Sequence, residues 1–79
     1  MTQLCTPDMV VDILATKVGV PANTPAIETA AWEELGVDSL GLSEVIAGIW
    51  HLLGVELPHE EAMNTTNLRE LVTLVNTQF

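Results

Sequence analysis

The segment from Ser39 to Leu53 has helical periodicity and is bounded by breakers on both sides. Gly36-Val37-Asp38 precedes it and Gly54 follows it. At 3.6 residues per turn, six of its apolar residues share one wide face: Leu42, Val45, Ile46, Ile49, Leu52 and Leu53. The opposite face carries Leu40, Glu44, Ala47, Gly48 and His51, with Trp50 at its edge. We therefore expect an amphipathic helix over residues 39–53 that buries one face against other elements.

Two further helices and a short one are predicted around it. Thr6-Pro7-Asp8 is typical of a helix start, apolar residues then recur at helical spacing, and Gly19 supplies a stop, so residues 7–18 form a helix. Asn67 and Glu70 have the spacing of a capping box, and Leu68, Leu71, Val72 and Val75 form an apolar stripe. They predict a helix over residues 67–77, and residues 59–63 are expected to add one turn.

Residues 19–38 contain prolines, Asn23 and Gly36, which break regular structure. We expect a long loop there, anchored by Ile27, Trp32 and Leu35, with a short helical turn within residues 28–35. No alternation is long enough for a β-strand. The sequence thus predicts an all-α bundle of three long helices and one short helix, forming a single domain over residues 1–79.

The charge of the chain excludes several kinds of partner. Two basic residues stand against eleven acidic ones, giving a formal net charge of −9. Nucleic acids and anionic membranes are excluded, because their binding depends on cationic side chains, whereas basic proteins are attracted. A single cysteine, Cys5, rules out a disulfide framework and a cysteine-based zinc site, and we expect it in a mobile N-terminal stretch without a role. With no signal peptide and no membrane-spanning run, we expect a soluble, cytoplasmic monomer without a metal.

Ser39 is the residue most clearly placed for chemistry. It follows a glycine turn at a helix N-terminus, where unpaired N–H groups and a partial positive charge suit a phosphate ester. The chain offers no base to activate it: His51 lies about 18 Å further along the same helix. The alternative role for Ser39 is that of a helix cap only, but Asp38 can cap equally well. The pattern favours a serine that another protein modifies over one that catalyses.

Several motifs together resemble acyl carrier proteins. Leu35-Gly36-Val37-Asp38-Ser39-Leu40 resembles their Gly-x-Asp-Ser-Leu motif, and Trp32-Glu33-Glu34-Leu35 is similar to the stretch that precedes it. Gly54-Val55-Glu56-Leu57-Pro58 looks like their Gly-Val-x-Ile-Pro link. The run from Arg69 to Asn76 resembles the last helix of carriers from type II polyketide synthases more than that of fatty-acid carriers.

The resemblance implies a non-catalytic carrier with an acyl-carrier-like helical bundle. Ser39 would accept 4′-phosphopantetheine from coenzyme A through a phosphopantetheinyl transferase. The carrier would then shuttle thioester-bound acyl or polyketide intermediates between a ketosynthase, an acyltransferase and tailoring enzymes. The resemblance also assigns partner recognition to six residues: Asp38, Leu40, Glu44, Ala47, Glu60 and Glu61. Arg69 and Asn76 would be surface residues or polar groups that face the interior near a bound chain, and the resemblance favours the second.

The sequence departs from fatty-acid carriers along the helix at residues 39–53. Those carriers generally have further acidic residues at the positions of Gly41, Trp50 and His51. We therefore expect partner binding there to depend more on shape and apolar contact, and fatty-acid synthase enzymes to recognise the chain poorly.

Two alternatives remain. A peptidyl or aryl carrier of nonribosomal peptide synthesis shares the chemistry, although such carriers more often have Gly-Gly-His/Asp-Ser at this junction. An acidic helical adaptor whose serine is never modified is the other alternative.

Overall fold

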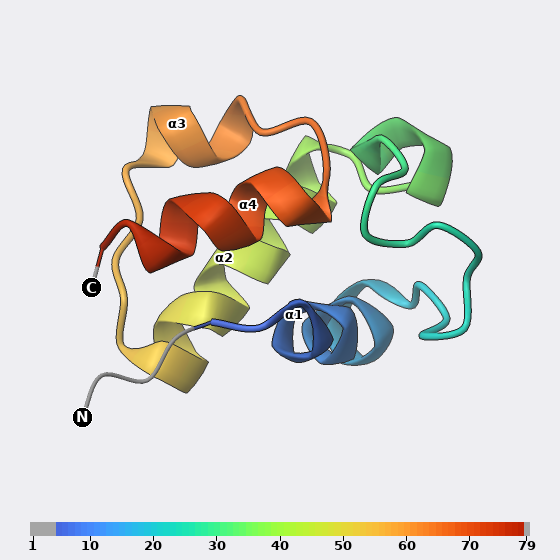
Figure 1. The fold of residues 1–79 in the computed structure, drawn as a ribbon, viewed down its shortest axis with the longest axis horizontal. Helices are drawn as coiled ribbons and strands as arrows, with labels where there is room; N and C mark the ends of the chain where they lie inside the picture. Colours follow the sequence, from blue (N-terminus) through green and yellow to red (C-terminus); the bar gives the residue numbers. More distant parts are fainter. Residues whose placement is uncertain (1–4, 79) are drawn as a thin grey trace.

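The computed structural model describes residues 5–78 and contains helices joined by loops within that range. The elements are α1 (Pro7–Ile13) continued by a π-helical turn (Leu14–Val18), a 3₁₀ turn (Trp32–Leu35), α2 (Ser39–Leu53), α3 (His59–Met63) and α4 (Leu68–Asn76). α1 and α3 each pack against both α2 and α4. Figure 1 shows α4 between α1 and α3, with α2 crossing behind it.

The predicted all-α architecture is confirmed, and each predicted helix lies within a residue or two of its expected position. The first helix reaches residue 18 as expected, but its last turn is π-helical. There the Thr16 hydroxyl donates to the carbonyl oxygen of Asp12 at 2.9 Å, a bond that competes with the regular backbone ladder. Within residues 5–78 no helix combines the length and hydrophobicity needed to cross a bilayer.

One apolar cluster joins the four helices. Its largest fully buried side chains are Val10, Leu14, Val45, Ile49, Leu68, Leu71 and Val75. The expectation that Leu52 also belongs to the core is wrong, because 55% of this residue is exposed. Leu52 lies near the C-terminal end of α2, where it lines an open groove towards α1 and no element covers it.

The long loop is fixed to the start of α4. The indole nitrogen of the buried Trp32 donates to Thr65 Oγ1 at 3.2 Å, and its backbone N–H donates to the carbonyl of Thr66 at 3.0 Å. The N–H of Arg69, in the first turn of α4, donates to the carbonyl of Glu28 at 3.1 Å. The loop therefore satisfies backbone groups that a helix N-terminus leaves without partners. It is held in place although it has little regular structure.

Cys5 does not lie in a mobile stretch as expected. Only 4% of the residue is exposed. Its backbone N–H donates to Asn76 Oδ1 at 2.7 Å, and Asn76 Nδ2 donates back to the Cys5 carbonyl at 3.1 Å. Burial raises the pKa of the Cys5 thiol, which keeps it protonated and unreactive. The side chain of Asn76 thus attaches the segment before α1 to the end of α4.

Gly48 allows α1 to approach α2 closely. A Cβ atom at this position would lie 2.8 Å from Ile13 Cγ2, well inside van der Waals contact. Ile13 Cγ2 is attached directly to the branched Cβ, so it cannot swing away as the end of a longer side chain would. The contact explains a glycine in the middle of α2, where alanine would otherwise favour the helix by about 1 kcal/mol.

We predict that Gly48→Ala lowers the free energy of unfolding by about 1 kcal/mol. The cost of overpacking against Ile13, about 1–3 kcal/mol, outweighs the gain of about 1 kcal/mol in helix propensity. Urea unfolding measures the effect. In an Ile13→Ala background, where Cγ2 is missing, the same substitution should become neutral or stabilising. Equal stabilisation by Gly48→Ala in both backgrounds would show that the contact with Ile13 does not limit this position.

Candidate functional site

Asp38, and not Ser39, is the N-cap of α2. Its backbone is extended, and its Oδ1 accepts from the N–H of Gly41 at 2.7 Å. Ser39 is the first residue of the helix and is exposed. Among the side-chain hydrogen bonds found within residues 5–78, none involves the Ser39 hydroxyl. The hydroxyl is therefore displayed to solvent at the positive end of a 15-residue helix.

The residues before Asp38 set the direction in which the chain enters α2. Gly36 has a φ of +77°, a left-handed conformation that favours glycine, and it closes the 3₁₀ turn. Val37 follows as a buried residue, and its N–H donates to the carbonyl of Trp32 at 2.9 Å. Because Trp32 is itself anchored at Thr65, the position of Ser39 is fixed through this chain of contacts.

A hollow of about 340 Å³ opens beside Ser39. Trp32 and Val37 from the loop, Leu42 from α2 and Met63 at the end of α3 all line it. We call it the Ser39 hollow. The exposed hydroxyl, the helix N-terminus and the free space around them fit a phosphate ester that continues into a chain with apolar segments. The residues present therefore suit a 4′-phosphopantetheine group.

The geometry does not suit a hydrolytic serine. No histidine is among the residues that line the Ser39 hollow. The carboxylate of Asp38 does line it, but its Oδ1 is bonded to the Gly41 N–H rather than to Ser39. A nucleophilic serine requires a base within hydrogen-bond reach. In the described part of the chain, no cluster of three or more His, Cys, Asp or Glu side chains is placed to hold a metal.

The residues expected to recognise partners are exposed. Leu40 is 72% exposed, the largest value among the exposed large hydrophobic residues of the described structure. Glu44 and Ala47 follow it at spacings of four and seven residues and are also exposed, so the three form one strip on α2. Glu60 and Glu61 are exposed in the first turn of α3. This strip, together with Asp38 and these glutamates, is called the partner surface below.

Arg69 and Asn76 do not come together as interior polar groups. The Arg69 side chain is 67% exposed and forms a 3.8 Å ion pair with Glu28 at the surface. Arg69 is the neighbour of Leu68, which α4 buries in the core. Adjacent residues of a helix lie on different faces, so the Arg69 side chain points outward. Asn76 is partly buried, but its side chain is engaged with the backbone of Cys5. The expected interior position is therefore wrong for Arg69.

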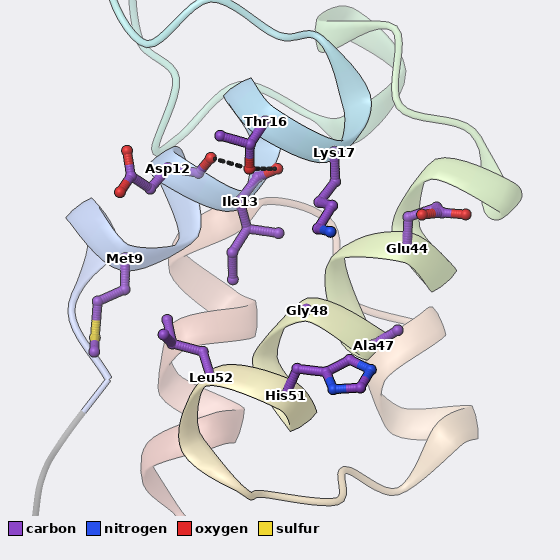
Figure 2. Close-up of a pocket in the computed structure, with 10 residues that line it drawn as sticks. All are labelled: Met9, Asp12, Ile13, Thr16, Lys17, Glu44, Ala47, Gly48, His51 and Leu52. Atoms are coloured by element: carbon purple, nitrogen blue, oxygen red, sulfur yellow. Dashed lines mark hydrogen bonds between the residues drawn. The ribbon is translucent and has the colours of Figure 1, made fainter.

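Two further hollows flank α2 and were not predicted from the sequence. A groove of about 700 Å³ lies between α1 and α2, and Figure 2 shows Ile13 and Lys17 on one side with Ala47 and Leu52 on the other. A smaller hollow of about 200 Å³ lies on another side of α2, against the link that leads to α3, and Trp50 is in its lining. The sequence placed Trp50 at the edge of the polar face of this helix, which was the available signal for the second hollow, and the structure leaves the residue half-exposed.

Comparison with known families gives a match that spans most of the chain. Residues 8–75 match the family described as phosphopantetheine attachment site. The matched range includes Ser39, the Ser39 hollow and the partner surface.

Similar solved structures are those of the actinorhodin acyl carrier protein from Streptomyces coelicolor. Its holo form is 30% identical to this chain with a TM-score of 0.80. Its malonyl form and its 3,5-dioxohexyl form, a triketide mimic from the actinorhodin polyketide synthase, are each 28% identical with a TM-score of 0.82. In each case the alignment covers 99% of this chain and 94% of the other. The chain thus belongs to the phosphopantetheine-attachment family as an acyl carrier protein, most like those of type II polyketide synthases.

Proposed function

We propose that Ser39 is the attachment residue and that the chain carries acyl or polyketide intermediates between the enzymes of a synthase. The proposal rests on the division of roles at the start of α2. Asp38 caps the helix, Ser39 is exposed, and no side-chain hydrogen bond to Ser39 Oγ is found among residues 5–78. When bound, 4′-phosphopantetheine supplies a thiol that holds the acyl group as a thioester.

The residues around Ser39 bind and orient but do not catalyse. The N-terminus of α2 stabilises the negative charge of a phosphodiester on Ser39. The loop residues Trp32 and Val37, both buried, hold that terminus rigidly. Attachment therefore depends on a separate phosphopantetheinyl transferase, which supplies the groups that activate the hydroxyl.

Ser43 provides a matched control for the attachment residue, because the chain contains two serines one helical turn apart. After incubation with coenzyme A and a broad-specificity phosphopantetheinyl transferase, intact mass spectrometry should show one added phosphopantetheine. Ser39→Ala should abolish the addition and Ser43→Ala should retain it. An unloaded wild-type chain would favour the acidic adaptor, and loading of Ser39→Ala would refute the assignment.

The partner surface supports docking of basic proteins. The chain has a net charge of −9, and Glu44, Glu60 and Glu61 surround an apolar strip that begins at Leu40. Enzymes that present an apolar pocket with a basic rim fit this pattern. The phosphopantetheinyl transferase, the ketosynthase, the acyltransferase and the tailoring enzymes are the partners that we propose for it.

Leu40→Ala should lower kcat/KM of the transferase for the apo-protein by about tenfold, corresponding to about 1.4 kcal/mol, since an exposed anchor is lost. Glu44→Gln should have a smaller effect that fades as salt is added. Leu52→Ala is the control for Leu40→Ala, and Asp8→Asn, in the first turn of α1, is the acidic control for Glu44→Gln. Both positions are exposed and lie outside the partner surface. If Leu40→Ala and Leu52→Ala lowered kcat/KM equally, with unchanged unfolding curves, docking at the partner surface would be contradicted.

The same 4′-phosphopantetheine group, called the arm below, is expected on a peptidyl or aryl carrier. The added mass alone therefore does not separate the two kinds of carrier. The similarity to the actinorhodin carrier supports the polyketide assignment. Transfer of malonyl to the holo-protein by a polyketide acyltransferase, compared with transfer of an aminoacyl group by an adenylation domain, distinguishes them.

A further inference from the structure

Trp50 is a large aromatic residue that the core does not use. It is 53% exposed, whereas the other tryptophan, Trp32, is 6% exposed. Its ring lies against that of His51, with the centroids 5.3 Å apart. The hollow of about 200 Å³ at this position is lined by Ser43, Ile46, Ala47, Trp50, Glu56 and Leu57, and it is called the Trp50 hollow below. The lining is mixed, with Ile46, Ala47 and Leu57 apolar and Ser43 and Glu56 polar. An exposed indole at the edge of such a hollow offers a π face to a ligand.

The Trp50 hollow lies on the same side of α2 as Ser39. Ser43, Ile46 and Trp50 follow Ser39 at spacings of four, seven and eleven residues, each close to a whole number of turns. Ser39 lines one hollow on this side, and Ser43, Ile46 and Trp50 line the next. The groove towards α1 opens mainly on a different side, because Gly48 and Leu52 line it, and Ala47 lies at the border between the two. A chain that leaves Ser39 along this side of α2 therefore meets Trp50.

The distance from Ser39 to Trp50 matches the length of the arm. Trp50 lies eleven residues after Ser39, which corresponds to about 16 Å along the helix axis. About fourteen covalent bonds separate Oγ from the sulfur in a serine-linked phosphopantetheine, and at the rise of an extended peptide chain they span roughly 16 Å. The sulfur and the first atoms of the cargo can thus reach the Trp50 hollow, while Ser39 stays in place.

We propose that the Trp50 hollow is a surface site for the thioester end of the arm and that it selects planar, unsaturated or aromatic acyl groups over saturated ones. This inference rests on Ser39 as the attachment residue. The indole face stacks on planar π systems, Ile46 and Leu57 contact the apolar part of the cargo, and Ser43 offers a hydroxyl along the way. A saturated chain finds the same apolar contacts but no stacking partner.

The test loads Ser39 with 3-phenylpropanoyl- or 3-cyclohexylpropanoyl-phosphopantetheine, two cargoes with the same carbon skeleton. Intact mass confirms loading first, so a failure of attachment is recognised separately from a failure of this site. NMR then follows the indole N–H resonances. Trp32 lines the Ser39 hollow and senses the arm that both cargoes share, so it serves as the reference between the two loaded forms. The phenyl cargo should shift the Trp50 resonance several-fold more than the cyclohexyl cargo does, whereas the Trp32 resonance should be the same with both.

Leu52→Ala is the matched control for Trp50→Ala, since Leu52 is 55% exposed on the same helix but lines the groove towards α1. Trp50→Ala should return the phenyl proton shifts to those of the free thioester, whereas Trp50→Phe and Leu52→Ala should keep them displaced. Equal Trp50 shifts with both cargoes, or displaced phenyl shifts in Trp50→Ala, would overturn the proposal. A Trp50 resonance that moves only when a partner enzyme is added would assign the residue to docking and would also overturn it.

Discussion

The hydrogen bond from the Gly41 N–H to Asp38 Oδ1, at 2.7 Å, is the interaction on which the site depends. A helix N-terminus needs acceptors for its first N–H groups, and a serine at this junction is a common acceptor. Because Asp38 takes that role, Ser39 is not required for capping. Its hydroxyl points to solvent while the helix that carries it stays fixed. One residue stabilises the terminus and its neighbour remains available for modification.

The rest of the fold serves to hold that junction and to divide the surface of α2. Trp32 and Val37 anchor the entry to α2, and the loop that contains Trp32 is bonded to the start of α4. Gly48 brings α1 close to one side of α2. Another side carries the partner surface that begins at Leu40, and the side that contains Ser39 leads to Trp50. A single helix therefore carries one side for packing, another for the proposed docking and a third for the proposed attached group.

Much of this structure could be predicted from the sequence, because caps and periodicity are local signals. Thr6 and Asn67 cap α1 and α4 as expected, with Thr6 Oγ1 accepting from Met9 N and Asn67 Oδ1 from Glu70 N. The reciprocal bond of the second cap is displaced by one residue, since Glu70 Oε1 accepts from the N–H of Thr66 rather than from that of Asn67. Backbone geometry around the cap decides that detail, and residue types alone do not.

Tertiary contacts decided what the sequence could not predict. Periodicity places Leu52 on the apolar face, but no other element covers that end of α2. Cys5 is buried because Asn76, 71 residues later, binds its backbone. The Trp50 hollow exists because the link after α2 folds back beside it and contributes Glu56 and Leu57. Each of these features depends on two segments that are distant in sequence, so neither segment predicts it alone.

Hydrogen exchange of the Gly41 amide tests most directly whether Asp38 alone caps α2. Ser39→Ala should leave the exchange rate of this amide unchanged within about twofold, because the hydroxyl takes no part in the cap. Asp38→Ala should accelerate exchange by about fivefold, corresponding to the roughly 1 kcal/mol that an N-cap contributes. Faster exchange in Ser39→Ala, with no change in Asp38→Ala, would show that the serine is the cap and that its hydroxyl is not free for modification.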